Sequence, residues 1–167
     1  MDSQLIWKTN FKHRTMKQDP YSTESRCRMA ADSLKVVFIM PERKFALELA
    51  EVLHANFKGR LQVVGFAFTP LRVNAAFSLR PNLVFLHIDF DPKAVLRIAS
   101  EVKLLAPQAK VVGISRSYDL KVETVFRSAG ACGYFVEADN MIIMLDLVDR
   151  VARLAPGTCD NMLTSIQ

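Results

Sequence analysis

The chain has 167 residues, of which 50% are hydrophobic and 23% are charged, and its formal net charge is +5. This length and composition suit one globular domain of ordinary size, and they exclude collagen-like, low-complexity and wholly disordered chains. The longest apolar runs, such as Met141–Leu145, are far shorter than the roughly 20 residues of a membrane span, and the N-terminus lacks the apolar core of a secretory signal. We therefore expect a cytoplasmic protein that makes no membrane contact.

The pattern of the sequence divides the chain into three parts. Residues 1–33 contain no sustained apolar period and are predicted to be an N-terminal extension, either flexible or packed on the domain. Residues 34–156 alternate apolar and amphipathic runs and are predicted to form the domain. Residues 157–167 are polar again and are predicted to be a short C-terminal tail.

Five short runs within the predicted domain are apolar at mostly consecutive positions and rich in Val, Ile and Phe, a pattern typical of strands buried on both faces. The runs are Lys35–Met40, Leu61–Thr69, Leu83–Ile88, Lys110–Ser115 and Cys132–Val136. Each is followed by a segment with apolar residues at helical spacing, so strand and helix alternate five times. This alternation predicts a flavodoxin-like α/β fold, a doubly wound parallel sheet with ligand sites at the carboxyl ends of its strands.

Local signals mark the ends of the predicted helices. Asp119 and Asp139 are expected to cap the N-termini of the fourth and fifth helices. Gly130 follows the fourth helix, where a left-handed residue is expected. The cysteines Cys27, Cys132 and Cys159 are widely spaced, without a C-x-x-C pair, so we expect reduced thiols.

Two stretches carry a resemblance to a known family. Pro81–Ile88 contains the third predicted strand, and Ala129–Glu137 contains a Gly-Ala-x-Gly-Tyr pattern that leads into the fifth. Together with the five β-α repeats, they resemble the receiver domain of two-component response regulators over roughly residues 34–156. The resemblance implies a phosphorylatable switch whose positions can be compared one by one.

Several positions of that switch differ from the family pattern. A receiver holds Mg²⁺ with an acidic pair just after its first strand, and those places are occupied by Met40 and Pro41, with Glu42 following. The phospho-accepting aspartate of the family falls at His87, and its lysine falls at Glu137. The resemblance therefore implies a degenerate phospho-acceptor pocket, without the nucleophile, the metal ligands or the lysine that aspartyl phosphorylation needs.

Two other positions of the switch match the family. Ser115 keeps the hydroxyl group that ends the fourth strand, and Tyr134 keeps the aromatic partner of the switch. The sequence holds no other catalytic constellation, so we expect no enzymatic activity, no cofactor and no resident metal. The chain thus looks like a pseudo-receiver that retains the fold without the phosphorylation chemistry.

The degenerate pocket allows more than one interpretation. His87 can fill the former acceptor position and pair with Glu137 or Asp89 across it. Alternatively, His87 and nearby carboxylates can bind a metal, or His87 can itself be phosphorylated. A small-ligand or metal sensor would use the strand-end side chains of Glu42, His87, Asp89, Ser115 and Glu137.

The predicted fifth helix, residues 140–155, is apolar over a broad face. One stripe is expected to cover the sheet: Ile143, Leu147, Val151 and Leu154. A second apolar stripe beside it comprises Met141, Met144, Leu145, Val148 and Ala152. This second stripe predicts either an interface with another chain or a broad core face closed by the N-terminal extension or the C-terminal tail.

Charged side chains border the second stripe and are expected to make cross-subunit ion pairs; they are Asp146, Asp149, Arg150 and Arg153. In the receiver family the fourth helix, fifth strand and fifth helix form the dimer and docking surface. The resemblance therefore implies a homodimer through this face. Its predicted interface residues are Met141, Met144, Leu145, Val148, Asp149, Ala152 and Arg153.

The sequence as a whole favours a phosphorylation-independent regulatory module that acts by protein–protein contact in bacterial signal transduction or transcription control. Its expected partners are a second copy of the chain and another signalling or regulatory protein. The first alternative is the strand-end sensor. The second is a nucleic-acid-associated protein that uses Ile6–Arg14, where aromatic and basic side chains interleave, although DNA reading by this chain alone is not expected.

Overall fold

The computed structural model describes residues 33–89, 91–155, 159 and 163–164. All of them belong to the second of the two units into which the chain divides, Met1–Asp32 and Ser33–Gln167. The stretch Ile6–Arg14 and most of the predicted C-terminal tail lie outside the described residues.

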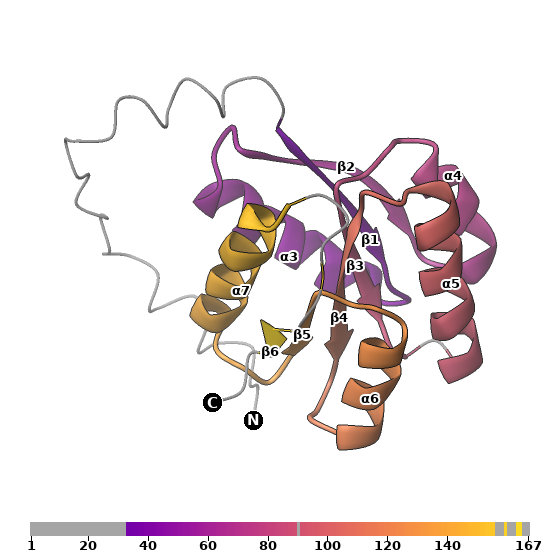
Figure 1. Ribbon diagram of the computed structural model, residues 1–167. Coiled ribbons are helices and arrows are strands. Elements are labelled where there is room, and N and C mark those ends of the chain that lie inside the picture. Colours follow the sequence, from indigo (N-terminus) through magenta and orange to yellow (C-terminus); the bar gives the residue numbers. More distant parts are fainter. Residues whose placement is uncertain (1–32, 90, 156–158, 160–162, 165–167) are drawn as a thin grey trace. The chain divides into compact units, whose positions relative to one another are not determined.

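In this part of the chain, six parallel strands form one sheet with the order β2-β1-β3-β4-β5-β6 (Figure 1). The strands are β1 (Leu34–Ile39), β2 (Leu61–Ala67), β3 (Leu83–His87), β4 (Lys110–Ser115), β5 (Gly133–Val136) and β6 (Leu163–Thr164). The first five have the order of a doubly wound sheet, so the predicted fold class is confirmed. The sequence did not predict β6, because a two-residue strand is too short to display a periodic pattern.

Helices cover both faces of this sheet. They are α3 (Arg43–Asn56), the 3₁₀ turn η1 (Pro70–Arg72), α4 (Val73–Phe77), α5 (Pro92–Leu105), α6 (Leu120–Ser128) and α7 (Met141–Arg153). Helices α3 and α7 pack on one face, and α4, α5 and α6 pack on the other (Figure 1). Among the described helices, none has the length and apolar character that a bilayer span requires.

The strands send alternate side chains into two separate cores. From β1, Val36 and Phe38 face α3 and α7, whereas Val37 and Ile39 face the helices of the other side. Phe38 stacks on Phe85 of the neighbouring strand, with ring centroids 5.0 Å apart. Both faces of the central strands are therefore buried, as the consecutive apolar runs predict.

The helix ends follow the local signals with one exception. Asp119 caps α6 by accepting a hydrogen bond from a backbone N–H in its first turn, and Gly130 follows that helix with φ +74°. The N-terminus of α7 is capped by Asn140 and not by Asp139. The prediction for Asp139 was wrong because its carboxylate accepts a hydrogen bond from the N–H of Val136 instead.

A buried lysine from β4 holds the C-terminus of α7. The Nζ of Lys110 donates to the carbonyl oxygens of Val151 at 2.9 Å and Ala152 at 3.3 Å, and also to that of Leu154. The last carbonyls of a helix have no partner within the helix, and a cation there also interacts favourably with the helix dipole. Burial lowers the pKa of Lys110 below its usual value, and these carbonyl contacts offset part of the cost of desolvating the ammonium group.

Replacing Lys110 with methionine is expected to lower the free energy of unfolding by about 1–2 kcal/mol, because the helix-end carbonyls lose a charged donor. Urea denaturation of the variant and the parent protein measures this loss. The exposed Lys58 provides the matched control, and Lys58→Met should leave the midpoint nearly unchanged. Equal midpoints for Lys110→Met and Lys58→Met would contradict the capping role.

Cys132 and Cys159 form a disulfide, with their Cα atoms 4.8 Å apart. The prediction of reduced thiols was wrong for these two residues. Linear spacing does not reveal that the chain returns to the sheet after α7, where β6 pairs with Gly133 and Tyr134 of β5. The outer edge of β5 is thus occupied by β6, and the strand edge that the predicted dimer face includes is covered by the chain itself.

Candidate functional site

The carboxyl ends of β1, β3, β4 and β5 bring the predicted pocket residues to one edge of the sheet. Backbone pairing continues past the strand ends, since the N–H of Ile88 donates to Ile114 at 2.9 Å and the N–H of Glu137 donates to Ser115 at 2.8 Å. These bonds hold the carboxyl ends of β3 and β5 against β4, with His87 as the last residue of β3 and Glu137 directly after β5. His87 and Glu137 therefore meet although 50 positions separate them in the sequence.

His87 forms the floor of this site. Its Nε2 lies 2.6 Å from Oε1 of Glu137, and its Nδ1 accepts a hydrogen bond from the backbone N–H of Asp89 at 3.0 Å. Because Nδ1 acts as an acceptor, the neutral ring carries its proton on Nε2 and donates it to Glu137. The side chain is almost completely buried, and the ring meets Phe45 edge to face.

Arg116 forms the rim of the site. Its Nη2 lies 2.8 Å from Oδ2 of Asp89 and 3.7 Å from Oε2 of Glu42. One guanidinium thus neutralises two carboxylates from different loops, close to where the resemblance places a metal ion. Arg116 was not among the predicted site residues. The available signal was a cation directly after Ser115 at the end of a strand.

The two residues in the places of the acidic pair supply no metal ligands. Met40 is fully buried in the core beneath α3 and α7, and its backbone N–H donates to Ala67 of β2 at 3.0 Å. Pro41 is exposed and has no polar side-chain atom. A hard cation such as Mg²⁺ requires oxygen ligands, which neither side chain has.

Ser115 and Tyr134 form a buried hydroxyl pair behind this site. The oxygen atoms of the two side chains are 2.6 Å apart, and Ser115 Oγ donates to the carbonyl of Ser117 at 2.7 Å. Since the serine has one hydroxyl proton and uses it on Ser117, Tyr134 donates to Ser115. Burial raises the pKa of Tyr134 above its usual value, which keeps the phenol neutral.

Within the described residues, no group of three or more His, Cys, Asp or Glu side chains is placed to hold a metal ion. Glu42 and Asp89 face Arg116, and Glu137 faces His87. An open groove of about 600 Å³ lies elsewhere, between α3 and the start of β2, and is lined by Leu47, Glu51 and Val63 among others. The carboxylates of the strand-end site therefore already have partners within the chain, and this does not favour the interpretation of the site as a metal site.

The structure changes the interpretation of α7. Met141, Met144 and Val148 are buried in the core, so their assignment to an interface with another chain was wrong. Leu145 and Ala152 are only partly exposed. The helix is rotated relative to the prediction, so that Ile143, which was expected to cover the sheet, faces outward.

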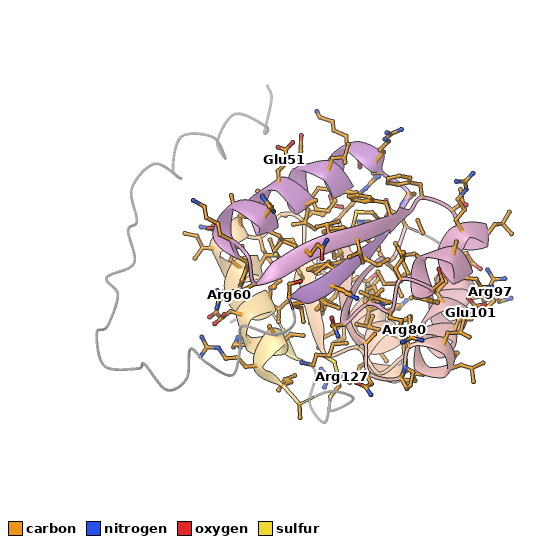
Figure 2. The ribbon with its side chains drawn as sticks, turned by 90° about the horizontal axis from the view of Figure 1, so that it is seen from above. Glu51, Arg60, Arg80, Arg97, Glu101 and Arg127 are labelled. Atoms are coloured by element: carbon orange, nitrogen blue, oxygen red, sulfur yellow. A yellow bond between two sulfur atoms is a disulfide. The ribbon has the colours of Figure 1, made fainter. Side chains whose placement is uncertain are left out.

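The charged residues of α7 pair within the chain. Asp149 lies 3.7 Å from Arg60 at the start of β2, and it also contacts Arg153 one turn along α7. Figure 2 shows Arg60 on the side of the domain where α7 lies. Asp146 pairs with Arg150 at 3.0 Å in the same i,i+4 manner. These charged side chains therefore have partners within the chain.

Solved structures of receiver domains resemble this domain. The isolated REC domain of RcsB from Salmonella enterica serovar Typhimurium, solved with the phosphomimetic BeF3⁻, matches with TM-score 0.66 and 8% identity over 80% of this chain and 96% of that chain. The signal receiver domain of a DNA-binding response regulator from Colwellia psychrerythraea 34H matches with TM-score 0.63 and 16% identity over 74% and 100%. The response regulator domain of CheB from Thermotoga maritima matches with TM-score 0.61 and 15% identity over 73% and 96%.

Two comparisons of the sequence found no match. No protein-family model matches it, and no curated protein matches it either. These three structures have less than 25% identity to this chain, so they show the architecture alone. Together with the strand order and the two-sided helical layers, they establish that this domain has the fold of response-regulator receiver domains.

Proposed function

We propose that the protein is a pseudo-receiver, a signalling module that acts by protein contact and not by aspartyl phosphorylation. The observation that carries the proposal is the 2.6 Å contact between His87 Nε2 and Glu137 Oε1. These residues stand where the resemblance places the phospho-acceptor and its lysine. Because the two side chains bind each other, each already has a partner at the position where the family handles a phosphoryl group.

The charges at the strand ends support this proposal. Aspartyl phosphorylation needs a carboxylate nucleophile, a divalent cation and a group that stabilises the phosphoryl charge. His87 supplies no carboxylate, and Glu137 would repel a phosphoryl group instead of stabilising it. Arg116, held by Asp89 and Glu42, supplies the positive charge at the rim.

The proposal predicts that the protein incorporates no phosphate from acetyl phosphate in the presence of Mg²⁺. Intact-mass spectrometry should find only the unmodified mass after prolonged incubation, because no aspartate occupies the acceptor position. A receiver domain with a complete acidic site, treated in parallel, serves as the positive control. A stable Mg²⁺-dependent mass increase of one phosphoryl group would overturn the proposal. The same treatment of His87→Ala would then show whether His87 carries the phosphoryl group.

The partner surface that we propose comprises the N-terminal ends of α6 and α7, which follow the carboxyl ends of the neighbouring strands β4 and β5. Exposed apolar side chains lie at or just before the starts of these helices. Tyr118 is 50% exposed before α6, Leu120 is 66% exposed at its first position, and Ile142 is 56% exposed in the first turn of α7. Monomeric soluble domains routinely expose isolated apolar residues. These three residues favour a contact because they all lie near the carboxyl ends of β4 and β5. We assign this surface to a homodimer contact.

Ile142→Asp and Leu120→Asp are each expected to convert a dimer into a monomer, because a carboxylate buried in an apolar contact has no compensating partner. Light scattering coupled to size-exclusion chromatography measures the mass. Leu71 is 92% exposed on η1, far along the chain from both helices, so Leu71→Asp is the control and should remain dimeric. A parent protein that stays monomeric at high concentration would refute the dimer assignment and leave the absence of phosphorylation as a separate question.

A further inference from the structure

The disulfide and β6 lie together on the side of β5 that faces away from β4. Cys132 directly precedes Gly133, the first residue of β5, and Cys159 lies beyond the end of α7. Next to this bond, β6 pairs with Gly133 and Tyr134, on the side of β5 away from β4. The covalent link and the strand pairing thus close the same edge together.

The two cysteine residues differ in their burial. Cys132 is fully buried in the core beneath α3 and α7, whereas Cys159 is only partly buried against that core. A cavity of about 230 Å³ opens beside Cys159 and is also lined by Lys103, Pro107 and Gly130. A thiolate can therefore approach Cys159, and the ammonium group of Lys103 favours the approach of an anion.

The strand pairing alone is small. β6 contributes two residue pairs to the sheet, compared with four pairs between β4 and β5. So short a strand gains few hydrogen bonds against the entropy cost of ordering its segment. The covalent bond beside it therefore adds a second restraint that keeps the segment of β6 near β5.

We propose that Cys132 and Cys159 form a thiol-redox modification site that controls whether the outer edge of β5 is open. A dithiol reductant attacks the sulfur of Cys159, the S–S bond breaks, and Cys132 leaves as a thiolate that takes a proton from solvent. The second thiol of the reductant then attacks the reductant sulfur that is bonded to Cys159. This closes the disulfide of the reductant and releases Cys159 as a thiol. The protein gains two electrons and two protons, and the reductant becomes a disulfide.

Reduction at this site releases β6 and exposes the backbone N–H and C=O groups of β5. An unpaired strand edge is a template for pairing with another strand. Tyr134, which donates to Ser115 across the site described above, lies on the exposed strand. The thiol state of the surroundings would thereby alter the strand that carries the hydroxyl pair, independently of any phosphoryl chemistry.

Hydrogen exchange with and without the disulfide tests this inference. The full chain is oxidised with oxidised glutathione, and alkylation followed by intact-mass measurement should find one free thiol among the three cysteines. Treatment with dithiothreitol should give three free thiols and speed exchange of the outward-facing amides of Gly133–Val136 by about tenfold or more. In the reduced protein the outward-facing amides of β5 should exchange far faster than the amides of Leu34–Ile39, an inner strand whose exchange reports global unfolding.

The variant Cys159→Ser provides the matched comparison, because it removes the accessible sulfur and leaves the buried one in place. Without any reductant it should exchange in β5 as fast as the reduced parent, and dithiothreitol should not change it further. Three alkylated thiols in the oxidised preparation would overturn the inference. So would a disulfide whose reduction leaves the exchange of β5 unaltered.

Discussion

Cys159→Ser is expected to lower the free energy of unfolding by about 3.5 kcal/mol at 25 °C, the largest effect of any substitution proposed for this protein. The disulfide closes a loop across a sequence separation of 27, and in the chain-entropy account a loop of that length restricts the unfolded state by about this amount. The variant loses this restriction without creating a cavity in the core, since Cys159 is only partly buried. Chemical denaturation of the oxidised parent and of the variant measures the difference.

The reduced parent protein is the control for this result. Dithiothreitol should bring the unfolding midpoint of the parent to that of Cys159→Ser and should have no effect on the variant. If the variant were as stable as the oxidised parent, Cys132 and Cys159 would not be linked in the folded protein. A variant weakened further by dithiothreitol would point to a different thiol bond.

Glu137→Leu is expected to lower the free energy of unfolding by about 1.5–3 kcal/mol, because the buried N–H of His87 loses its charged acceptor. The 2.6 Å contact and the almost complete burial of His87 make replacement by water costly. Urea denaturation near neutral pH measures the loss. The same substitution also removes the negative charge that faces the former acceptor position.

Glu137→Gln separates the hydrogen bond from the charge in this experiment. The amide oxygen can still accept from Nε2 of His87, so the loss should stay under about 1 kcal/mol. If glutamine and leucine destabilise the protein equally, the hydrogen bond does not hold His87 in place. An unchanged stability in both variants would show that Glu137 acts only as a surface residue.

The fold could be predicted from the sequence because its central strands are buried on both faces. Leu83–His87 and Lys110–Ser115 are buried at every position, and such strands appear as consecutive apolar runs separated by helical segments. The sixth strand could not be predicted in this way. It depends on where the chain goes after α7, and this is set by tertiary contacts that include the bond between Cys132 and Cys159.

The candidate site could be predicted only in part. The order of the strands places His87 and Glu137 at neighbouring ends, and the resemblance identified both positions. Arg116 could not be predicted as a site residue, because its role depends on the carboxylates of Glu42 and Asp89, which lie far from it in the sequence. In α7, two adjacent apolar rows have the same helical spacing, so periodicity alone does not determine which row faces the sheet.

The contacts of Arg116 and of His87 at the strand ends differ in exposure, and this difference has a consequence for solution conditions. The side chain of Arg116 is 63% exposed, whereas that of His87 is 3% exposed. Mobile ions screen exposed charge pairs strongly and buried pairs weakly. As ionic strength rises, the contacts of Arg116 with Asp89 and Glu42 should weaken while the contact between His87 and Glu137 keeps its geometry.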